Sequence, residues 1–229
     1  EYVEEFEGNF ANYCGVKYCL GVNNGTSALH LALLALGIGE GDEVIIPAQT
    51  FIATAWGVTY CKAKVVFVDI EPSTYTMDVS KIEVSITSKT KAIIPVHLYG
   101  QPANMDEILK IAKKYNIFVI EDAAQAHGAL YKGKKAGSFG DVSCFSFYPS
   151  KGLGAFGEGG AVVTNNQEIA EKIGILRNHG QSKRYYHDVV GFNYRMTNLQ
   201  AAIGVAQMEN ISYYINSKNA TAFILIFCY

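Results

Sequence analysis

Near the middle of the chain stands Val119-Ile-Glu-Asp-Ala-Ala-Gln125, an apolar run that ends in two carboxylates and then small residues. Such a run is typical of a strand buried on both faces of a sheet. In an open α/β sheet, ligands bind at the carboxyl ends of the strands, where Asp122 would lie. A carboxylate there can pair with a protonated ring nitrogen. The alternative is that Glu121 and Asp122 only begin a helix, whose dipole favours acidic side chains.

Similar short runs recur on both sides of this stretch. We expect strands at residues 18–22, 43–47, 64–69, 91–96, 118–121, 143–147 and 160–164. Between the earlier ones, residues 27–36, 51–63 and 105–115 are apolar at helix-like spacing. This alternation predicts an α/β domain with a largely parallel sheet. A glycine-rich loop joins the last two strands in place of a helix, so that part of the sheet is expected to depart from the pattern.

A lysine follows the sixth predicted strand. Lys151 stands among aromatic and glycine residues, and Asp141 is the one other charged residue between Gly140 and Phe156. Lysines are rarely buried without a purpose, and an amine in an apolar pocket can act as a nucleophile. The alternative is a solvated loop lysine, which is what we expect of the hairpin turn Lys132-Gly-Lys-Lys135.

The segment Asn23-Asn-Gly-Thr-Ser27 lies between a predicted strand and a helix that we expect to begin near Ala28. The N-terminus of a helix offers free N–H groups and the positive end of its dipole, which together hold a phosphate. Gly25 permits close backbone approach, and Thr26 and Ser27 add hydroxyl donors. The alternative is an ordinary turn with an N-cap.

Together these three features supply the groups that one cofactor needs, namely a site for its phosphate, a carboxylate for its ring nitrogen and an amine for its aldehyde. Each is weak alone, but in this order on an α/β domain they predict a site for pyridoxal 5′-phosphate (PLP). A plain α/β binding domain without PLP is the remaining alternative.

Composition narrows the classes of function. The chain has 229 residues, 49% of them hydrophobic and 17% charged, and a formal net charge of -2. No basic stripe could follow a nucleic-acid backbone. The five cysteines show no metal-ligand spacing, so we expect reduced thiols and no metal. No signal peptide and no apolar stretch of roughly 18 residues is present, so we expect no membrane partner and a cytoplasmic location.

Seven ordered motifs carry a resemblance that covers roughly residues 2–210. They are Asn24-Gly-Thr-Ser-Ala-Leu29, Ile46-Pro-Ala-Gln-Thr-Phe51, Pro95-Val-His-Leu-Tyr-Gly-Gln101, Glu121-Asp-Ala-Ala-Gln-Ala-His-Gly128, Phe145-Ser-Phe-Tyr-Pro-Ser-Lys151, Gly157-Glu-Gly-Gly160 and Gly191-Phe-Asn-Tyr-Arg195. In these the sequence resembles the DegT/DnrJ-type sugar aminotransferases, which are fold-type I PLP-dependent enzymes. The resemblance implies a three-layer major domain with a mixed, mostly parallel seven-stranded sheet.

The same resemblance implies a role for each site residue. Lys151 would carry PLP as a Schiff base and then move protons. Asp122 would bind the pyridine nitrogen, and Gln125 would contact the phenolic oxygen. The other cofactor-binding residues would be Gly25, Thr26, Ser27 and Ser146 at the phosphate, Phe51 against one ring face, and Asn193, which would reach the phosphate of a neighbouring subunit in a homodimer. For His97 and His127 we expect structural roles.

The implied activity is transfer of an amino group, from glutamate, to a nucleotide-linked keto-sugar in amino-sugar biosynthesis, for a cell-surface polysaccharide or a glycosylated metabolite. Tyr148-Pro-Ser-Lys-Gly-Leu-Gly-Ala-Phe156 resembles members that act at the sugar 3-position, whereas Asn193-Tyr-Arg-Met-Thr-Asn-Leu199 resembles members that act at the 4-position. Position 3 is slightly favoured. Related dehydratases carry histidine in place of Lys151, so transamination is the favoured reaction. Another cyclic ketone is an alternative acceptor.

The two ends bear on domain organisation. Residues 1–13 resemble a helix already under way, and residues 211–229 turn polar and then end in an apolar run that departs from the helical continuation of the family. We therefore expect a PLP-binding major domain at residues 1–210, with its N-terminal segment missing, and the start of a connection to an absent C-terminal domain at 211–229. A truncated relative that binds PLP without turnover is the alternative from a different class. We expect the apolar tail to promote association.

Overall fold

The computed structural model describes the backbone of residues 1–227 and the side chains of residues 1–221. At its centre is a seven-stranded sheet in the order β1-β9-β8-β5-β4-β2-β3. Neighbouring strands are parallel from β8 to β3, and β9 runs antiparallel to both β8 and β1. The strands are β1 (Tyr18–Val22), β2 (Glu43–Pro47), β3 (Lys64–Val68), β4 (Thr90–Ile93), β5 (Phe118–Asp122), β8 (Val142–Ser146) and β9 (Gly160–Thr164). The expectation of a mixed, mostly parallel sheet is confirmed.

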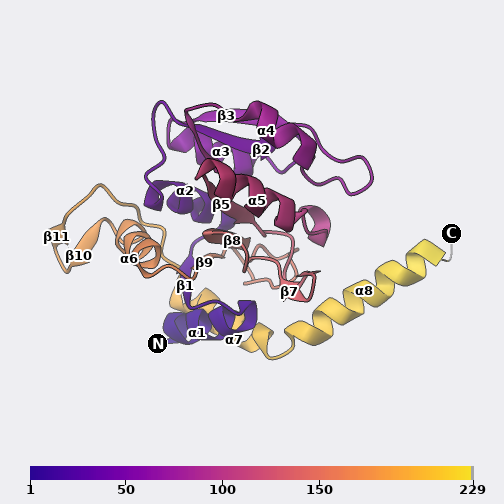
Figure 1. The fold of residues 1–229 in the computed structure, drawn as a ribbon. Coiled ribbons are helices and arrows are strands. Elements are labelled where there is room, and N and C mark those ends of the chain that lie inside the picture. Colours follow the sequence, from indigo (N-terminus) through magenta and orange to yellow (C-terminus); the bar gives the residue numbers. More distant parts are fainter. Residues whose placement is uncertain (228–229) are drawn as a thin grey trace.

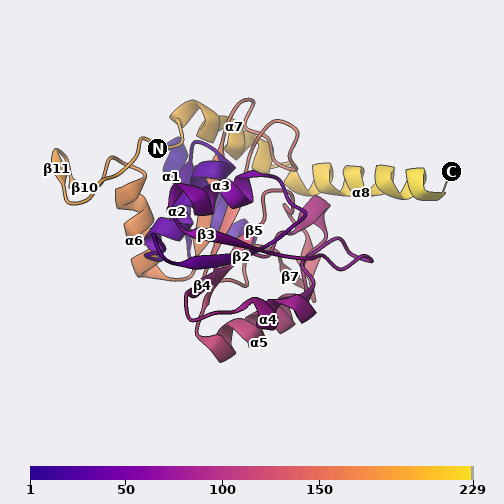
Figure 2. The same cartoon turned by 90° about the horizontal axis from the view of Figure 1, so that it is seen from above.

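Helices cover both faces of the sheet and give the domain three layers (Figure 1). One face carries α2 (Gly25–Ala35), α3 (Ala53–Tyr60) and α6 (Gln167–Leu176). The other face carries α1 (Tyr2–Cys14) and α7 (Asn198–Met208), which lie side by side, and α4 (Ile82–Ser85) and α5 (Met105–Tyr115), which lie together beside β2 and β4 (Figure 2).

The central strands are buried on both sides because their alternate side chains enter different cores. On β2, Val44 and Ile46 pack under α2 and α3, whereas Ile45 packs against α5. All three side chains have no exposed surface. This two-sided burial explains why these strands are uniformly apolar in sequence instead of alternating.

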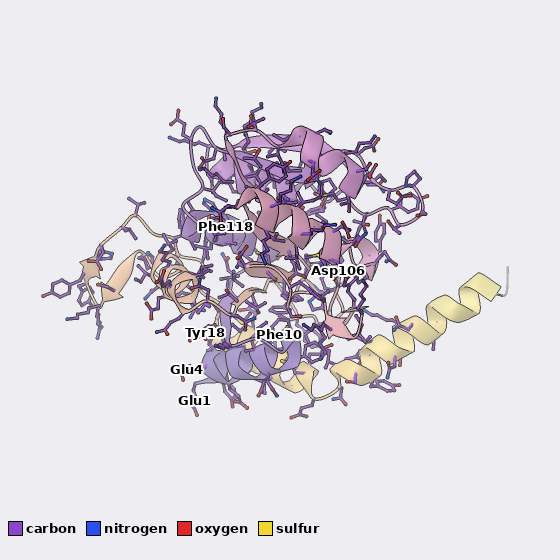
Figure 3. All side chains as sticks on the ribbon, in the orientation of Figure 1. Glu1, Glu4, Phe10, Tyr18, Asp106 and Phe118 are labelled. Atoms are coloured by element: carbon purple, nitrogen blue, oxygen red, sulfur yellow. The ribbon has the colours of Figure 1, made fainter. Side chains whose placement is uncertain are left out.

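An aromatic cluster fixes α1 to the sheet. Phe6 and Phe10 on α1 meet Phe145 and Phe147 at the end of β8, with ring centroids 5.0–5.1 Å apart in edge-to-face contacts. Burial of one such side chain contributes about 1.5–3 kcal/mol. Phe10 lies on the sheet side of α1, while Glu1 and Glu4 lie at the outer end of this helix (Figure 3).

The antiparallel edge of the sheet brings three chain segments together. Gly160, the first residue of β9, lies opposite both Val22 at the end of β1 and Ser146 at the end of β8. A Cβ atom on Gly160 would stand 2.5 Å from the carbonyl carbon of Asn24. Glycine at this position therefore lets the segment after β1 pass over β9 toward β8.

Several expectations from the sequence need correction at their boundaries. The helix expected near Ala28 begins at Gly25, because the Asn24 side chain caps it by accepting a hydrogen bond from Ser27 N–H at 2.8 Å. The strand expected to reach residue 96 ends at Ile93, two residues before Pro95, which has no N–H to donate. The helix expected over 51–63 spans only Ala53–Tyr60. α6 was not predicted at all.

The lysines of the 132–135 turn are not all solvated. The strands β6 (Leu130–Tyr131) and β7 (Lys134–Lys135) form the expected hairpin. Lys135, however, is half-buried, with its Nζ atom 3.4 Å from the centroid of the Tyr13 ring and 2.6 Å from the Tyr13 carbonyl oxygen. Burial lowers the pKa of this amine.

The remaining small elements are η1 (Val79–Lys81), η2 (Leu98–Gly100) and the hairpin of β10 (Gln181–Lys183) and β11 (Tyr186–His187).

The C-terminal segment is helical, and the expectation that it departs from a helical continuation is wrong. α8 (Ile211–Phe227) runs outward from the body of the domain (Figure 1). Ile211 is buried against the cluster beneath α1, and Ile215 packs beside it. The sequence predicts that the apolar run at 222–229 is exposed. This prediction concerns side chains outside those that the structure describes. Within the described residues, no helix combines the length and apolar character needed to cross a membrane.

Candidate active site

A cavity of about 840 Å³ opens at the carboxyl edge of the sheet. Its walls come from the segment after β1, the start of α2, the first turns of α3, and the segments that follow β5 and β8. Eight residues selected from the sequence line it, namely Gly25, Thr26, Ser27, Phe51, Asp122, Gln125, Ser146 and Lys151. The ninth, Asn193, does not.

The N-terminus of α2 forms one end of the cavity. No hydrogen bond from the N–H groups of Gly25 and Thr26 forms within the part of the chain that the structure describes. The hydroxyl groups of Thr26 and Ser27 lie in the same turn, and Ser146 faces it from β8. A Cβ atom on Gly25 would stand 2.8 Å from Ser146 Cβ, so only glycine permits this approach. Free N–H groups, hydroxyls and a helix dipole make this end suited to a phosphate.

Asp122 lies at the floor of the cavity, at the last position of β5. Its side chain is buried, and its Oδ2 atom accepts a hydrogen bond from the Thr54 hydroxyl at 2.7 Å. Oδ1 accepts a hydrogen bond from Ala124 N–H at 3.2 Å. Burial raises the pKa of Asp122, although these two hydrogen bonds and the neighbouring His97 and Lys151 oppose the rise. The carboxylate is therefore placed where an adjacent positive charge would stabilise it.

Glu121 precedes Asp122 on β5 and points into the opposite layer. It is wholly buried and accepts hydrogen bonds from the N–H groups of Gly137, Phe139 and Gly140, from Ser143 Oγ, and from a ring nitrogen of His97 at 2.9 Å. Burial alone would raise its pKa, but the His97 contact and these N–H groups lower the pKa overall. The alternative in which both acids begin a helix is wrong, because both lie in the strand.

Gln125 is oriented by a backbone contact. Tyr99, which has a left-handed φ of 54°, donates its N–H to Gln125 Oε1 at 2.7 Å. Because the amide oxygen accepts this hydrogen bond, the Nε2 group is the part of the side chain that can donate hydrogen bonds into the cavity.

Lys151 lies in the loop after β8 and is half-buried, which is less burial than its apolar surroundings in the sequence suggested. Its side chain lines the same cavity as Asp122. Its backbone N–H donates to Tyr148 O at 2.9 Å, and its carbonyl oxygen accepts a hydrogen bond from Lys218 Nζ on α8 at 3.1 Å. A turn within the loop and a contact with α8 therefore fix the backbone of Lys151.

Asn193 is exposed and lies outside the cavity, on a segment paired with Asn178. Its neighbour Tyr194 lines the cavity and stacks on Phe192, with ring centroids 4.8 Å apart. The structure thus separates Asn193 from the other selected residues of the same chain.

The two histidines of the motifs occupy buried positions away from the cavity lining. His97 bridges Glu121 and Ala103 N–H. The ring nitrogens of His127 have no partner among the described residues, and burial lowers its pKa to about 3, so the ring is neutral. No group of three potential metal ligands occurs within the described residues.

Sequence reasoning missed several residues of the cavity. Thr54, which donates to Asp122, lies 68 residues earlier in the chain. His30, one turn beyond Ser27, lines the wall near Tyr194, and burial lowers its pKa. Tyr99 belongs to the motif Pro95–Gln101, but nothing in the sequence shows that its N–H meets Gln125. The position of Thr54 in the first turn of α3, the helix that follows β2, is a signal, since the carboxyl end of β2 lies at the same edge of the sheet.

The sequence matches a known protein family over nearly its whole length. Residues 1–226 match the DegT/DnrJ/EryC1/StrS aminotransferase family. Over 219 residues the chain is 53% identical to the GDP-perosamine synthase of Caulobacter vibrioides, and the match covers 95% of this chain and 59% of that protein. It is 52% identical to the UDP-2-acetamido-2-deoxy-3-oxo-D-glucuronate aminotransferase of Pseudomonas aeruginosa, over 90% of this chain and 58% of that protein.

A solved structure shows the same fold. NtdA of Bacillus subtilis, crystallised with its cofactor PMP bound, superposes with a TM-score of 0.88 at 40% sequence identity. The superposition covers 93% of this chain and 49% of that chain. The chain thus spans somewhat less than three fifths of the length of these curated relatives.

Proposed function

The chain belongs to the DegT/DnrJ/EryC1/StrS aminotransferase family, whose cofactor is PLP, and from this we propose that the protein transfers an amino group from glutamate to a nucleotide-linked keto-sugar. We propose further that residues 1–210 form its cofactor-binding domain. Relatives named for GDP- and UDP-sugars support the class of acceptor, with a keto group on the sugar ring.

The residues of the cavity fit PLP. The phosphate would be held by the N-terminus of α2, with Thr26, Ser27 and Ser146, and the ring nitrogen by Asp122. Phe51, which is 64% exposed beside the cavity, offers an aromatic face for the ring. The observation that carries the proposal is that an anion site, a buried carboxylate and a primary amine line one cavity.

Each side chain then has a task. Bound there, PLP supplies an aldehyde that takes up amines and an electron-poor ring that stabilises negative charge on the adjacent carbon. Lys151 Nζ takes and returns the proton at the α-carbon of the amino donor. Asp122, when ionised, keeps the proton on the ring nitrogen, and Gln125 Nε2 donates to the phenolic oxygen. The apolar walls keep water away from these steps.

We propose a homodimer in which Asn193 completes the cavity of the partner subunit. Support comes from its position, because Asn193 is exposed and does not line the cavity of its own chain, while its neighbour Tyr194 does. The segment that precedes it, which includes the β10–β11 hairpin, carries the exposed side chains of Tyr185, Tyr186 and Val190. An exposed apolar group of this kind suits a contact between subunits.

The transfer can be tested in one half-reaction. The chain is loaded with PLP, freed of excess cofactor and mixed with glutamate, and 2-oxoglutarate is measured against a Lys151→Ala control. We expect close to one equivalent of 2-oxoglutarate per bound cofactor in the unaltered chain and none in the control. Equal amounts in the two proteins would contradict the proposal. Cofactor binding without 2-oxoglutarate would favour the relative that binds PLP without turnover.

A further inference from the structure

The hydroxyl of Thr54 reaches the carboxylate at the floor of the cavity from a different layer of the domain. Thr54 lies in the first turn of α3, has no exposed surface, and stands 2.7 Å from Asp122 Oδ2. Its own hydroxyl oxygen lies 2.8 Å from the hydroxyl of Thr50, which lines the cavity. The three groups form a continuous chain of hydrogen bonds from the cavity wall to the carboxylate.

The direction of this chain is set by its last member. An ionised carboxylate can only accept hydrogen bonds, so the proton of Thr54 must point to Asp122. The oxygen of Thr54 is then free to accept, and Thr50 must be the donor between the two hydroxyls. Hydrogen bonds in such a chain strengthen one another when they run in one direction.

The Asp122 carboxylate depends on Thr54 because few other hydrogen bonds reach it among the described residues. The second oxygen, Oδ1, accepts only the longer hydrogen bond from Ala124 N–H at 3.2 Å within the described residues. A hydroxyl that is both buried and directed at Oδ2 fixes the rotation of the carboxyl group as well as its charge. Free rotation would turn both oxygens away from any group above them in the cavity.

We propose that Thr54, supported by Thr50, is a positioning residue that holds Asp122 ionised and oriented toward the ring nitrogen of the cofactor. This inference rests on the proposed function, since it assumes that PLP occupies the cavity. Thr54 itself lies beneath the floor and acts only through Asp122.

Other groups around Asp122 affect the same ionisation and must stay unchanged in a test. His97 and Lys151, on the segments after β4 and β8, both lower the pKa of Asp122. Glu121 precedes Asp122 on β5, and the buried thiol of Cys144 faces it from β8. On α3, Thr54 supplies a neutral donor, so its removal changes no formal charge.

Three variants separate the hydroxyl from the shape of the side chain. Thr54→Val keeps the shape and removes the donor, whereas Thr54→Ser keeps the donor and removes a methyl group. Thr59→Val is the matched control on the same helix, because the Thr59 hydroxyl donates to Ala55 O and to no other group among the residues that the structure describes. Each protein is titrated with PLP over a range of pH, and reduction with borohydride then shows whether the cofactor is attached to Lys151.

We expect Thr54→Val to bind PLP roughly 10- to 100-fold more weakly, the range for loss of a hydrogen bond to a charged group. Thr54→Ser and Thr59→Val should stay within about threefold of the unaltered chain. Because the Thr54 hydrogen bond lowers the pKa of Asp122, its loss should also move the acid limit of PLP binding to higher pH. Thr50→Val should reproduce part of both effects, which provides a second test if Thr54→Val does not fold.

Two results would overturn the inference while the proposed function stands. One is labelling of Lys151 with equal PLP affinity and the same acid limit in Thr54→Val and the unaltered chain. The other is an equal loss in Thr54→Val and Thr54→Ser, which would assign the effect to packing. If the unaltered chain carries no label on Lys151, the proposed function fails and the inference fails with it.

Discussion

The Nε2 atom of His97 lies 2.9 Å from Oε2 of Glu121, and neither side chain has any exposed surface. This pair holds two loops to β5, because Glu121 also accepts the N–H groups of Gly137 and Gly140, while the backbone N–H of His97 donates to the carbonyl oxygen of Asp122 at 3.0 Å. Two adjacent carboxylates thus have different tasks. Glu121 stabilises the frame on one side of the sheet, and Asp122 serves the cavity on the other.

Replacement of Glu121 should destabilise the fold. In Glu121→Gln the amide cannot accept all five hydrogen bonds, and the negative charge that accepts them, including the one from His97, is lost. Loss of one member of a buried pair costs about 3 kcal/mol, which should appear as a lower midpoint in urea unfolding. Glu107→Gln on exposed α5 is the control and should change stability by less than about 0.5 kcal/mol. Equal midpoints for both variants would contradict this account.

The same pair gives a pH dependence of stability. Although burial acts to raise it, the pKa of Glu121 is lowered overall in the folded chain by His97 and the backbone N–H groups. Its stabilisation is therefore present above the unfolded value, near pH 4.3, and is lost as pH falls through the lower folded value. We expect stability to fall below about pH 4 and this fall to be smaller in Glu121→Gln. An identical acid profile for both proteins would be inconsistent with the role of Glu121.

A methyl group at Gly25 should disturb the phosphate end of the cavity. The added Cβ of Gly25→Ala would lie 2.8 Å from Ser146 Cβ and force the two segments apart. Overpacking of this kind costs about 1–3 kcal/mol, and we expect PLP affinity to fall roughly tenfold or more. Gly8→Ala on α1 meets no atom within 4 Å and should leave PLP affinity unchanged. Calorimetric titration with PLP checks both, and unaltered affinity in Gly25→Ala would refute the proposed phosphate site.

Gln125→Glu should weaken cofactor binding without loss of the Tyr99 contact. A glutamate oxygen can still accept Tyr99 N–H, but the second oxygen would replace the Nε2 donor with a negative charge. We expect PLP affinity at pH 8 to fall roughly tenfold or more, and the loss to shrink toward pH 5 as the new carboxyl takes up a proton. A pH-independent loss, measured by absorbance titration, would indicate that the amide serves packing alone.

The strands of this fold could be predicted because burial on both faces makes them continuously apolar. β1, β2 and β9 occur at their expected residues, and the missing helix between β8 and β9 was visible as a run of glycines. α6 was missed, although Asn166 caps it and Ile169, Ala170 and Ile173 form its buried face. Ile175 lies outside that buried face, so the polar and apolar sides of this short helix are less sharply separated than those of α5.

The candidate site could be predicted only where its residues follow strands. Residues at the carboxyl ends of parallel strands share one edge of the sheet, which is why residues as far apart as Gly25 and Lys151 line one cavity. No comparable rule predicts which residues of a helix contact which residues of the sheet. Thr54 meets Asp122 through the packing of α3 on the sheet, and Tyr99 meets Gln125 through a left-handed turn. Neither the local sequence nor its periodicity specifies these distances.

The central claim is that Lys151 holds PLP in this cavity. The chain is incubated with PLP, reduced with borohydride, digested and mapped by mass spectrometry, with Lys151→Ala and Lys132→Ala in parallel; Lys132 is an exposed hairpin lysine. We predict a pyridoxyl mass on the peptide of Lys151 in the unaltered chain and in Lys132→Ala, and no specific label in Lys151→Ala. Absence of label from Lys151, or equal labelling of surface lysines in all three proteins, would contradict the account.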